Sequence, residues 1–339
     1  MGRKGKIRVL LLALVVAGCG SAAASDDPEI VRLGYFPNLT HAPALVGLAD
    51  GLFAEELGER TLEGVTFNAG TEAVEALFSG ALDLAFTGPN PAINAHAQSD
   101  GEAIRIIAGS TSGGAALVVQ AEIDQSADLL GKRIATPALG NTQDVALRAW
   151  LNAEGLETDL EGGGMVAVIP QSNAQTLETF RSGDIDGAWV PEPWATRLVL
   201  EGGGKVLVDE RHLWPDGQFV TTHLIVRTQY LDTNPEAVAA VLRGLIRAVD
   251  AVNADPSSSQ ATVNESIESL TGSALSTEII QAAWQNLSFT LDPIASSLRK
   301  SADDAIAVGL LDPVDLTQIY ALGPLNEILT DLGREEVRS

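Results

Sequence analysis

A polar segment stands directly before a predicted helix near the start of the chain. Asn38, Thr40 and His41 precede the helical pattern of residues 44–57. The N–H groups and the positive dipole end at a helix start favour an anion, typically by about 0.3–1 kcal/mol. Thr40 also fits the N-cap position, and a plain cap without a ligand explains the segment equally well.

A second polar segment opens the predicted helix over residues 143–153. Here Gly140 is followed by Asn141 and Thr142, about one hundred residues after the first segment. A glycine that lets the backbone approach, then polar residues and a helix start, is a common anion-binding arrangement. We therefore expect Asn141 and Thr142 to contact an anionic ligand.

Small and polar residues also stand at the ends of predicted strands. Hydroxyl and amide groups at such places suit the oxygens of a sulfonate or a nitrate. The pair Gly113-Gly114 fits a hinge or a close backbone approach better than it fits chemistry. The ligand-binding candidates of this kind are Gly88, Asn90, Ser110, Thr111, Thr222 and His223.

Two residues near position 190 complete the candidate ligand set. Trp189 could cover the apolar part of a small ligand, although packing at a strand end explains it equally well. Glu192 would repel a simple anion and would instead suit an amine, as in taurine. A second interpretation of Glu192 is an ion pair with Arg197 or Arg148, which would carry no information about a ligand.

The histidines do not predict a metal site, because their scattered positions lack metal-ligand spacing. We expect His41 and His223 to donate hydrogen bonds in a cleft, His96 to lie on a helix surface and His212 to lie in a loop. The sequence predicts no cofactor.

Composition and motifs argue against two other function classes. The chain has 45 acidic and 21 basic residues, a net charge of −24 and no basic cluster, so it repels nucleic acid. Residues 109–113 resemble a hydrolase nucleophile elbow only loosely, because Thr111 stands at the centre. We therefore expect a binding protein and no enzyme.

The N-terminus has the pattern of a bacterial lipoprotein signal. Four basic residues precede an apolar run over residues 9–17, which is too short to span a bilayer. Small residues then lead to Cys19, the only cysteine, so no intramolecular disulfide is possible. We predict a signal peptide over residues 1–18, a lipid on Cys19 and a tether over residues 19–29. From Cys19 onward the net charge is −28.

Beyond residue 30, short apolar runs alternate with helical patterns, which indicates mostly parallel sheets covered by helices. The chain becomes mainly helical after residue 234. The predicted strands are 31–34, 64–67, 82–87, 104–108, 115–119, 133–136, 166–169, 187–190 and 222–226; the predicted helices are 44–57, 71–78, 143–153, 174–181 and 237–253.

One segment is repeated about a hundred residues later. Residues 71–86 and 174–189 share a helix, a Ser-Gly pair, an Asp and an aromatic residue in the same order. A Pro-x-Pro sequence follows each copy, at 89–91 and at 191–193. The repeat predicts two similar α/β lobes. Because ligands bind at the C-terminal strand ends of such sheets, both Pro-x-Pro loops are expected to face one cleft.

Four motifs occur together in this chain: Gly34-Tyr-Phe-Pro-Asn-Leu-Thr-His-Ala-Pro43, Gly51-Leu-Phe53, the Ser-Gly-x-x-Asp element and Trp189-Val-Pro-Glu-Pro-Trp194. Together they resemble the nitrate, taurine and aliphatic-sulfonate group of ABC-importer substrate-binding proteins. The resemblance covers about residues 30–330. It implies a type II periplasmic-binding-protein fold, with residues 30–110 and 225–339 in lobe one and residues 111–224 in lobe two.

The resemblance also implies a function and a location. We expect a monomer at the outer face of the cytoplasmic membrane or in the periplasm, which binds a small solute and delivers it to an ABC permease and its ATPase. An aliphatic sulfonate or taurine is favoured, followed by nitrate or bicarbonate. The alternatives are an enzyme on the same fold, similar to thiamine-pyrimidine synthases, or a sensor that does not transport.

Overall fold

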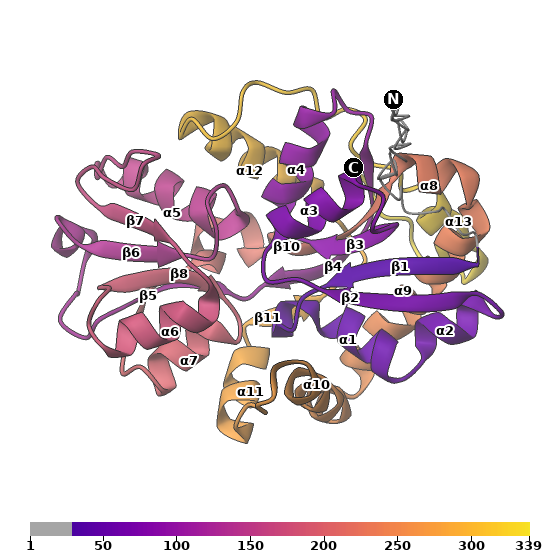
Figure 1. Cartoon of the computed structure of the whole chain (residues 1–339), viewed down its shortest axis with the longest axis horizontal. Helices are drawn as coiled ribbons and strands as arrows, with labels where there is room; N and C mark the ends of the chain where they lie inside the picture. The colour runs from indigo at the N-terminus through magenta and orange to yellow at the C-terminus, as the bar shows by residue number, and fades with distance from the viewer. Residues whose placement is uncertain (1–28) are drawn as a thin grey trace, which may run out of the picture.

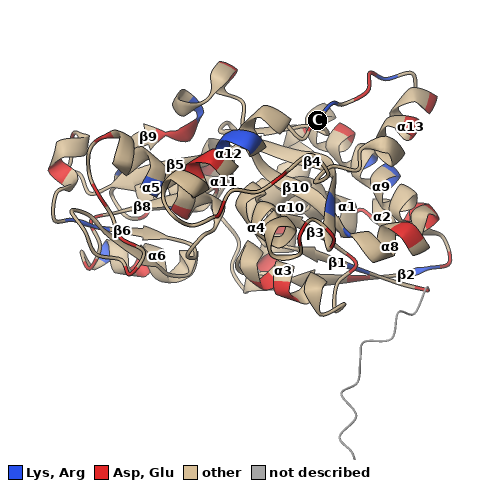
Figure 2. Ribbon diagram, turned by 90° about the horizontal axis from the view of Figure 1, so that it is seen from above, with Lys and Arg blue, Asp and Glu red and all other residues tan. Residues whose placement is uncertain are grey.

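The computed structural model describes residues 29–339, which form two β-sheets with helices on both faces (Figure 1). The predicted signal peptide and Cys19 lie outside the described residues. Within residues 29–339, no helix combines the length and apolar character that crossing a bilayer requires. Figure 2 shows acidic residues on the helices of both halves of the molecule, not in a single patch.

The first sheet has six strands in the order β11-β4-β10-β3-β1-β2. Its strands β1, β2 and β3 are parallel, whereas β10 runs antiparallel between β3 and β4. The bounds are β1 Ile30–Tyr35, β2 Thr61–Thr66, β3 Leu84–Thr87, β4 Ile104–Gly113, β10 Val220–Arg227 and β11 Leu287–Phe289.

The second sheet has five strands in the order β7-β6-β8-β5-β9. Here β7, β6 and β8 are parallel, and β5 pairs antiparallel with both β8 and β9. The bounds are β5 Ala115–Val119, β6 Arg133–Thr136, β7 Ala167–Pro170, β8 Gly187–Pro191 and β9 Lys205–Asp209.

Side chains alternate between the two faces of each sheet, and apolar side chains on both faces are buried against helices. Leu84 and Phe86 pack toward the helices of one face, whereas Ala85 between them packs toward the other face. The helices of the first half are α1 Ala42–Ala49, α2 Leu52–Leu57, α3 Gly70–Phe78, α4 Pro89–Gln98, α8 Thr228–Thr233, α9 Pro235–Ala254, α10 Pro256–Thr271, α11 Thr277–Trp284, α12 Ala295–Ala307 and α13 Gly323–Asp331; those of the second are α5 Thr142–Ala153, α6 Asn173–Arg181 and α7 Trp194–Leu200.

The chain passes between the two sheets at two places. The first is Gly113-Gly114, where β4 ends and β5 begins, and both glycines have a positive φ, of 79° and 73°. The second is the stretch between β9 and β10, which contains two short 3₁₀ helices, η3 Glu210–Leu213 and η4 Pro215–Gly217. The backbone at Gly113-Gly114 therefore needs glycine.

The repeat predicted from the sequence is a repeat in structure. In each copy a helix ends at a Ser, and the following glycine, Gly80 or Gly183, has a positive φ. In each copy an Asp then holds the neighbouring strand: Asp83 Oδ2 accepts from the Arg32 N–H at 2.9 Å, and Asp186 Oδ2 accepts from the Arg133 N–H at 2.8 Å. The two copies therefore share a side-chain contact as well as a chain path.

Some local predictions were wrong. The pattern over residues 44–57 forms two helices, because Gly51 adopts a positive φ and separates them. Residues 89–91 begin α4 and are no loop, since proline is compatible with a first helical turn. Ser110 to Gly113 continue β4. The short strands β9 and β11 were missed.

Replacement of the two equivalent aspartates, Asp83 and Asp186, should lower the stability by unequal amounts. The Asp83 side chain is 1% exposed and also accepts from Arg227, whereas the Asp186 side chain is 18% exposed. Asp83→Ala removes the buried acceptor of the Arg32 N–H and one acceptor of Arg227, and should lower the free energy of unfolding by about 3–5 kcal/mol. Asp186→Ala should cost about 1 kcal/mol. Urea unfolding of both variants measures the difference; equal losses would contradict it.

Candidate functional site

A small cavity lies between the two halves of the molecule, where strand ends and helix starts from both sheets meet. Its volume of about 40 Å³ gives room for roughly three water molecules. No Asp, Glu, Lys or Arg lines it. Six of the predicted ligand contacts are among its lining residues, which are Phe36, Asn38, Thr40, His41, Gly70, Gly88, Pro91, Asn141, Thr142, Gln143, Pro191 and Thr221.

The second half contributes the start of α5. Asn141 is the N-cap, and its side-chain oxygen accepts from the Asp144 N–H at 3.0 Å. Thr142 and Gln143 occupy the first turn, where backbone N–H groups have no acceptor within the helix. The cavity therefore meets a helix start of the kind that the sequence predicted, with its N–H donors and positive dipole end.

An acidic residue in this first turn is neutralised inside the protein. The Asp144 side chain is fully buried and accepts from Arg148 Nε at 3.1 Å, from Thr136 Oγ1 at 2.8 Å and from the Gly140 N–H at 3.0 Å. Arg148 is equally buried. The ion pair keeps the carboxylate from repelling an anion at the helix start.

The first half contributes the turn η1 Leu39–His41. Thr40 caps no helix, so that prediction was wrong: Thr40 lies inside η1, where its carbonyl accepts from Thr222 Oγ1 at 2.9 Å. Asn38 Oδ1 accepts from Trp194 Nε1 at 3.0 Å, which joins the two halves beside the cavity.

His41 is a neutral donor in this cavity. Burial lowers the pKa of His41 to about 3, so its imidazole is uncharged at neutral pH. Its Nδ1 accepts from the Phe36 N–H at 3.4 Å. The ring proton must then sit on Nε2, which can donate a hydrogen bond.

The two halves approach closely at Gly88. A Cβ at this position would lie 2.4 Å from Thr142 Oγ1, which belongs to the opposite half. Pro91 and Pro191 also line the cavity, as the prediction that both Pro-x-Pro segments face one cleft requires. A larger side chain at Gly88 would either displace Thr142 or hold the halves apart.

Comparison with known proteins agrees with this architecture. The model of the NMT1-like family matches residues 24–267. The chain belongs to this family. Among curated relatives, the taurine-binding periplasmic protein of Escherichia coli (strain K12) is 32% identical over 215 residues, which cover 63% of this chain and 64% of the relative. The putative aliphatic sulfonates-binding protein of the same organism is 27% identical over 240 residues, covering 70% and 71%.

Solved structures share the two-lobed α/β fold of periplasmic binding proteins. The periplasmic nitrate-binding protein NrtA from Synechocystis PCC 6803 superposes with a TM-score of 0.74 at 19% identity and covers 90% of this chain and 89% of its own. The alkanesulfonate-binding protein SsuA from Xanthomonas axonopodis pv. citri, bound to MOPS, gives 0.70 at 21% identity, covering 84% and 95%. The predicted fold class of this NMT1-like chain is confirmed.

Several predicted contacts of the NMT1-like chain lie outside the cavity lining. Asn90 Nδ2 donates to the Ser301 carbonyl at 3.2 Å, and His223 Nε2 lies 3.0 Å from the Pro293 carbonyl. Burial lowers the pKa of His223 to about 4. The hydroxyls of Ser110 and Thr111 are buried in β4. Thr222 is engaged with Thr40, and its neighbour Thr221 lines the cavity in its place.

Two further histidine expectations were tested. His96 is 2% exposed and its Nε2 lies 3.1 Å from the Asp315 carbonyl, so the prediction of a surface position was wrong. His212 is exposed in η3. Within residues 29–339, no group of three or more His, Cys, Asp or Glu side chains could hold a metal ion.

Trp189 belongs to the core of the second half and does not face the cavity. Its ring is fully buried 6.0 Å from the ring of Trp150. Trp189 Nε1 donates to Glu210 Oε2 at 2.7 Å, and Trp214 Nε1 donates to Glu210 Oε1 at 3.3 Å. Packing at a strand end, the alternative interpretation, is therefore correct for Trp189.

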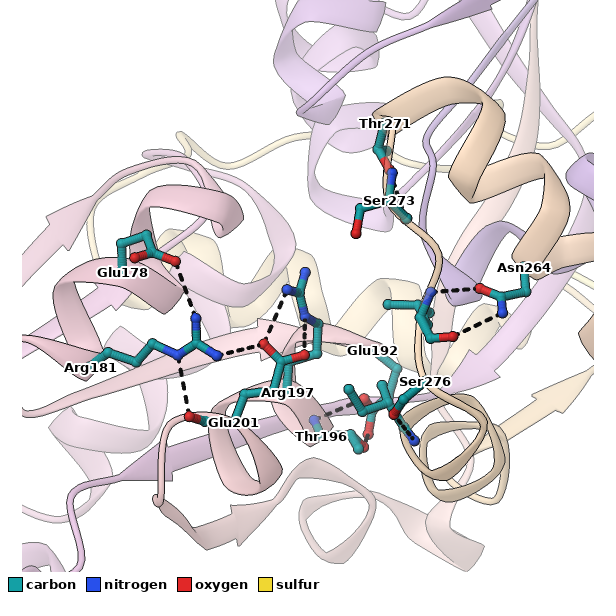
Figure 3. Close-up of polar contacts among 12 residues, drawn as sticks. Glu178, Arg181, Glu192, Thr196, Arg197, Glu201, Asn264, Thr271, Ser273 and Ser276 are labelled. Atoms are coloured by element: carbon teal, nitrogen blue, oxygen red, sulfur yellow. Dashed lines mark hydrogen bonds and ion pairs between the residues drawn. The ribbon is translucent and has the colours of Figure 1, made fainter.

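Glu192 forms neither of the ion pairs that the sequence suggested. Arg197 pairs with Glu201, as Figure 3 shows, and Arg148 pairs with Asp144. Glu192 accepts instead from Thr196 and from Asn286. It is absent from the lining of the cavity between the two halves.

The titration of Glu210 should make the free energy of unfolding depend on pH. Burial raises the pKa of Glu210 from 4.5 to about 7. The folded state therefore keeps a proton that the unfolded chain loses, and stability is present at low pH and lost as the pH rises through 7. The expected loss between pH 5 and pH 8 is about 3 kcal/mol.

Glu210→Gln removes the titration of Glu210. Comparison of this variant with the unmodified protein therefore separates the contribution of Glu210 from that of other titrating groups. Urea unfolding at pH 5, 6, 7 and 8 should show the variant gaining stability relative to the unmodified protein as the pH rises. His41 and His223 titrate equally in both proteins, so the difference reports Glu210 alone. A stability difference that is constant across this pH range would contradict the assignment.

Proposed function

We propose that this NMT1-like protein is the extracytoplasmic solute-binding component of an ABC importer and that it binds a small monoanion. The observation that carries the proposal is the uncharged, donor-lined cavity at the start of α5, between two lobes. The named relatives that bind taurine, sulfonates, bicarbonate or nitrate support the same class of solute. Because this chain matches only 64% of the taurine-binding relative, the solute is assigned from the cavity itself.

The chemistry of the cavity lining suits an alkylsulfonate better than it suits taurine. Its sulfonate oxygens accept hydrogen bonds from neutral donors such as Thr142 and His41, and its alkyl part suits Phe36 and the prolines. The ammonium group of taurine would find no carboxylate in the lining. Solute entry requires the lobes to part about the Gly113-Gly114 passage and then to close.

The solute would be delivered to a membrane permease and its ATPase, with the binding protein acting as a monomer. If the protein were an enzyme instead, a nucleophile or a metal ion would have to lie near the bound solute. The Ser110 and Thr111 hydroxyls lie outside the cavity lining, which favours the binding function over hydrolysis.

Titration calorimetry with ethanesulfonate, taurine, nitrate and bicarbonate tests the solute class. We expect ethanesulfonate to bind more tightly than taurine, because only taurine must bury an uncompensated ammonium group. Gly88→Ala should weaken binding about tenfold, which corresponds to 1.4 kcal/mol, since its Cβ meets Thr142. Gly323→Ala, where a Cβ meets nothing within 4 Å, is the matched control. No binding of any of these anions would refute the solute class.

The proposed membrane anchor is a lipid on Cys19, after removal of residues 1–18. Two or more acyl chains hold a protein on a membrane stably, because each buried methylene contributes about 0.8 kcal/mol. A tether over residues 19–29 would keep the lobes near the outer face of the membrane.

Radiolabelled palmitate tests the anchor in bacterial cells that express the full chain. The protein should incorporate label and sediment with membranes, whereas Cys19→Ala should lose the label and appear in the soluble fraction. Absence of label in the unmodified protein, or label that persists in Cys19→Ala, would refute the anchor.

A further inference from the structure

A second cavity lies beside Glu192, on different residues from the first. Its volume is about 200 Å³, five times that of the first cavity. The walls come from α7, β5 and β9 of the second half and from α11 of the first half, and the two cavities share no lining residue. Most of the wall is apolar, formed by side chains such as Ala116, Ala195, Val199 and Val206.

Glu192 is the one buried carboxylate among these apolar walls. It is 2% exposed and lines the cavity. Its Oε1 accepts from Thr196 Oγ1 at 2.9 Å and from Asn286 Nδ2 at 2.7 Å, and its Oε2 accepts from the Thr196 N–H at 3.1 Å. A carboxylate has about four acceptor positions, so one position on Oε2 is left without a donor from the protein.

No cation in the described part of the chain pairs with Glu192. Arg197 and Arg181 of the same region both bind Glu201, as Figure 3 shows. Arg211 binds Asp209, the other acidic residue of the cavity wall, through both carboxylate oxygens. Arg211 also donates to Asn286 Oδ1 at 2.9 Å, which turns the Asn286 amide N–H toward Glu192.

We propose that this second cavity binds a small primary alkylammonium ion, with the ammonium group on Glu192 and the alkyl chain against the alanine and valine side chains. A buried carboxylate without a cation is unfavourable, and an ammonium group supplies both the missing charge and a donor for Oε2. The site is independent of the proposed solute in the first cavity.

The affinity should depend on pH and on chain length. Burial raises the pKa of Glu192, and a protonated Glu192 cannot pair with an ammonium ion. Affinity therefore falls as the pH falls through the titration of Glu192; the hydrogen bonds from Asn286 and Thr196 and the charge of Arg211 partly oppose the effect of burial on its pKa. Each added methylene from methylammonium to butylammonium should tighten binding by up to about fourfold.

Titration calorimetry at pH 8 tests the proposal with methyl-, propyl- and butylammonium chloride and with 1-butanol as the neutral analogue. We expect binding that tightens along the series and is at least tenfold weaker for 1-butanol. Equal binding of butylammonium and 1-butanol would overturn the proposal, as would no detectable binding of butylammonium.

Two variants test whether butylammonium binding depends on the second cavity itself or on a general change in the protein. Glu192→Gln should lose butylammonium binding, whereas Glu201→Gln, which removes a carboxylate at the C-terminal end of α7, should keep it. Val206 is 50% exposed at the rim, so Val206→Trp should fold and block the cavity without removing any charge. Unchanged butylammonium affinity in both Glu192→Gln and Val206→Trp would refute the site, and ethanesulfonate binding in these variants reports separately on the first cavity.

Discussion

Parallel pairing of β1 with β3 and of β6 with β8 is the constraint on which the site depends. Parallel strands bring their carboxyl ends to one edge of a sheet, and each is followed there by a turn and a helix. Two such edges face each other, so η1 and Gly88 from one half meet the start of α5 from the other. Asp83 and Asp186 hold these pairings by accepting from the backbone of the neighbouring strand.

The protein separates its abundant acidic charge from its candidate solute site. Asp144 lies in the first turn of α5 yet is bound by Arg148, and Glu210 is enclosed by two indole N–H groups. Charges on the surface are screened beyond about 8–10 Å, whereas the N–H dipoles at a helix start act at contact distance. A strongly acidic protein can therefore present an uncharged pocket that favours an anion.

Several hydrogen bonds join the two halves. Trp194 donates to Asn38, Asn286 donates to Glu192, and Asn94 donates to the Gly140 carbonyl at 3.4 Å. A single hydrogen bond contributes about 0.5–1.5 kcal/mol when both partners are neutral and about 1.5–3 kcal/mol when one is charged. Such an interface can open and close without disturbing the two cores, which lie within each half.

The sequence by itself determined the features that depend on near neighbours. Glycine at the helix ends, the polar helix start at residues 140–143, the nine predicted strands and the repeat of residues 71–86 follow from local backbone preferences and from spacing. Only the tertiary structure decided which polar side chains face a cavity. The irregular register of β10 presents Thr221 and not Thr222, Trp189 finds its acceptor 21 residues away in Glu210, and Glu192 finds Asn286 94 residues away. These contacts depend on how segments that are distant in the sequence pack against one another, and a local sequence pattern does not encode that packing.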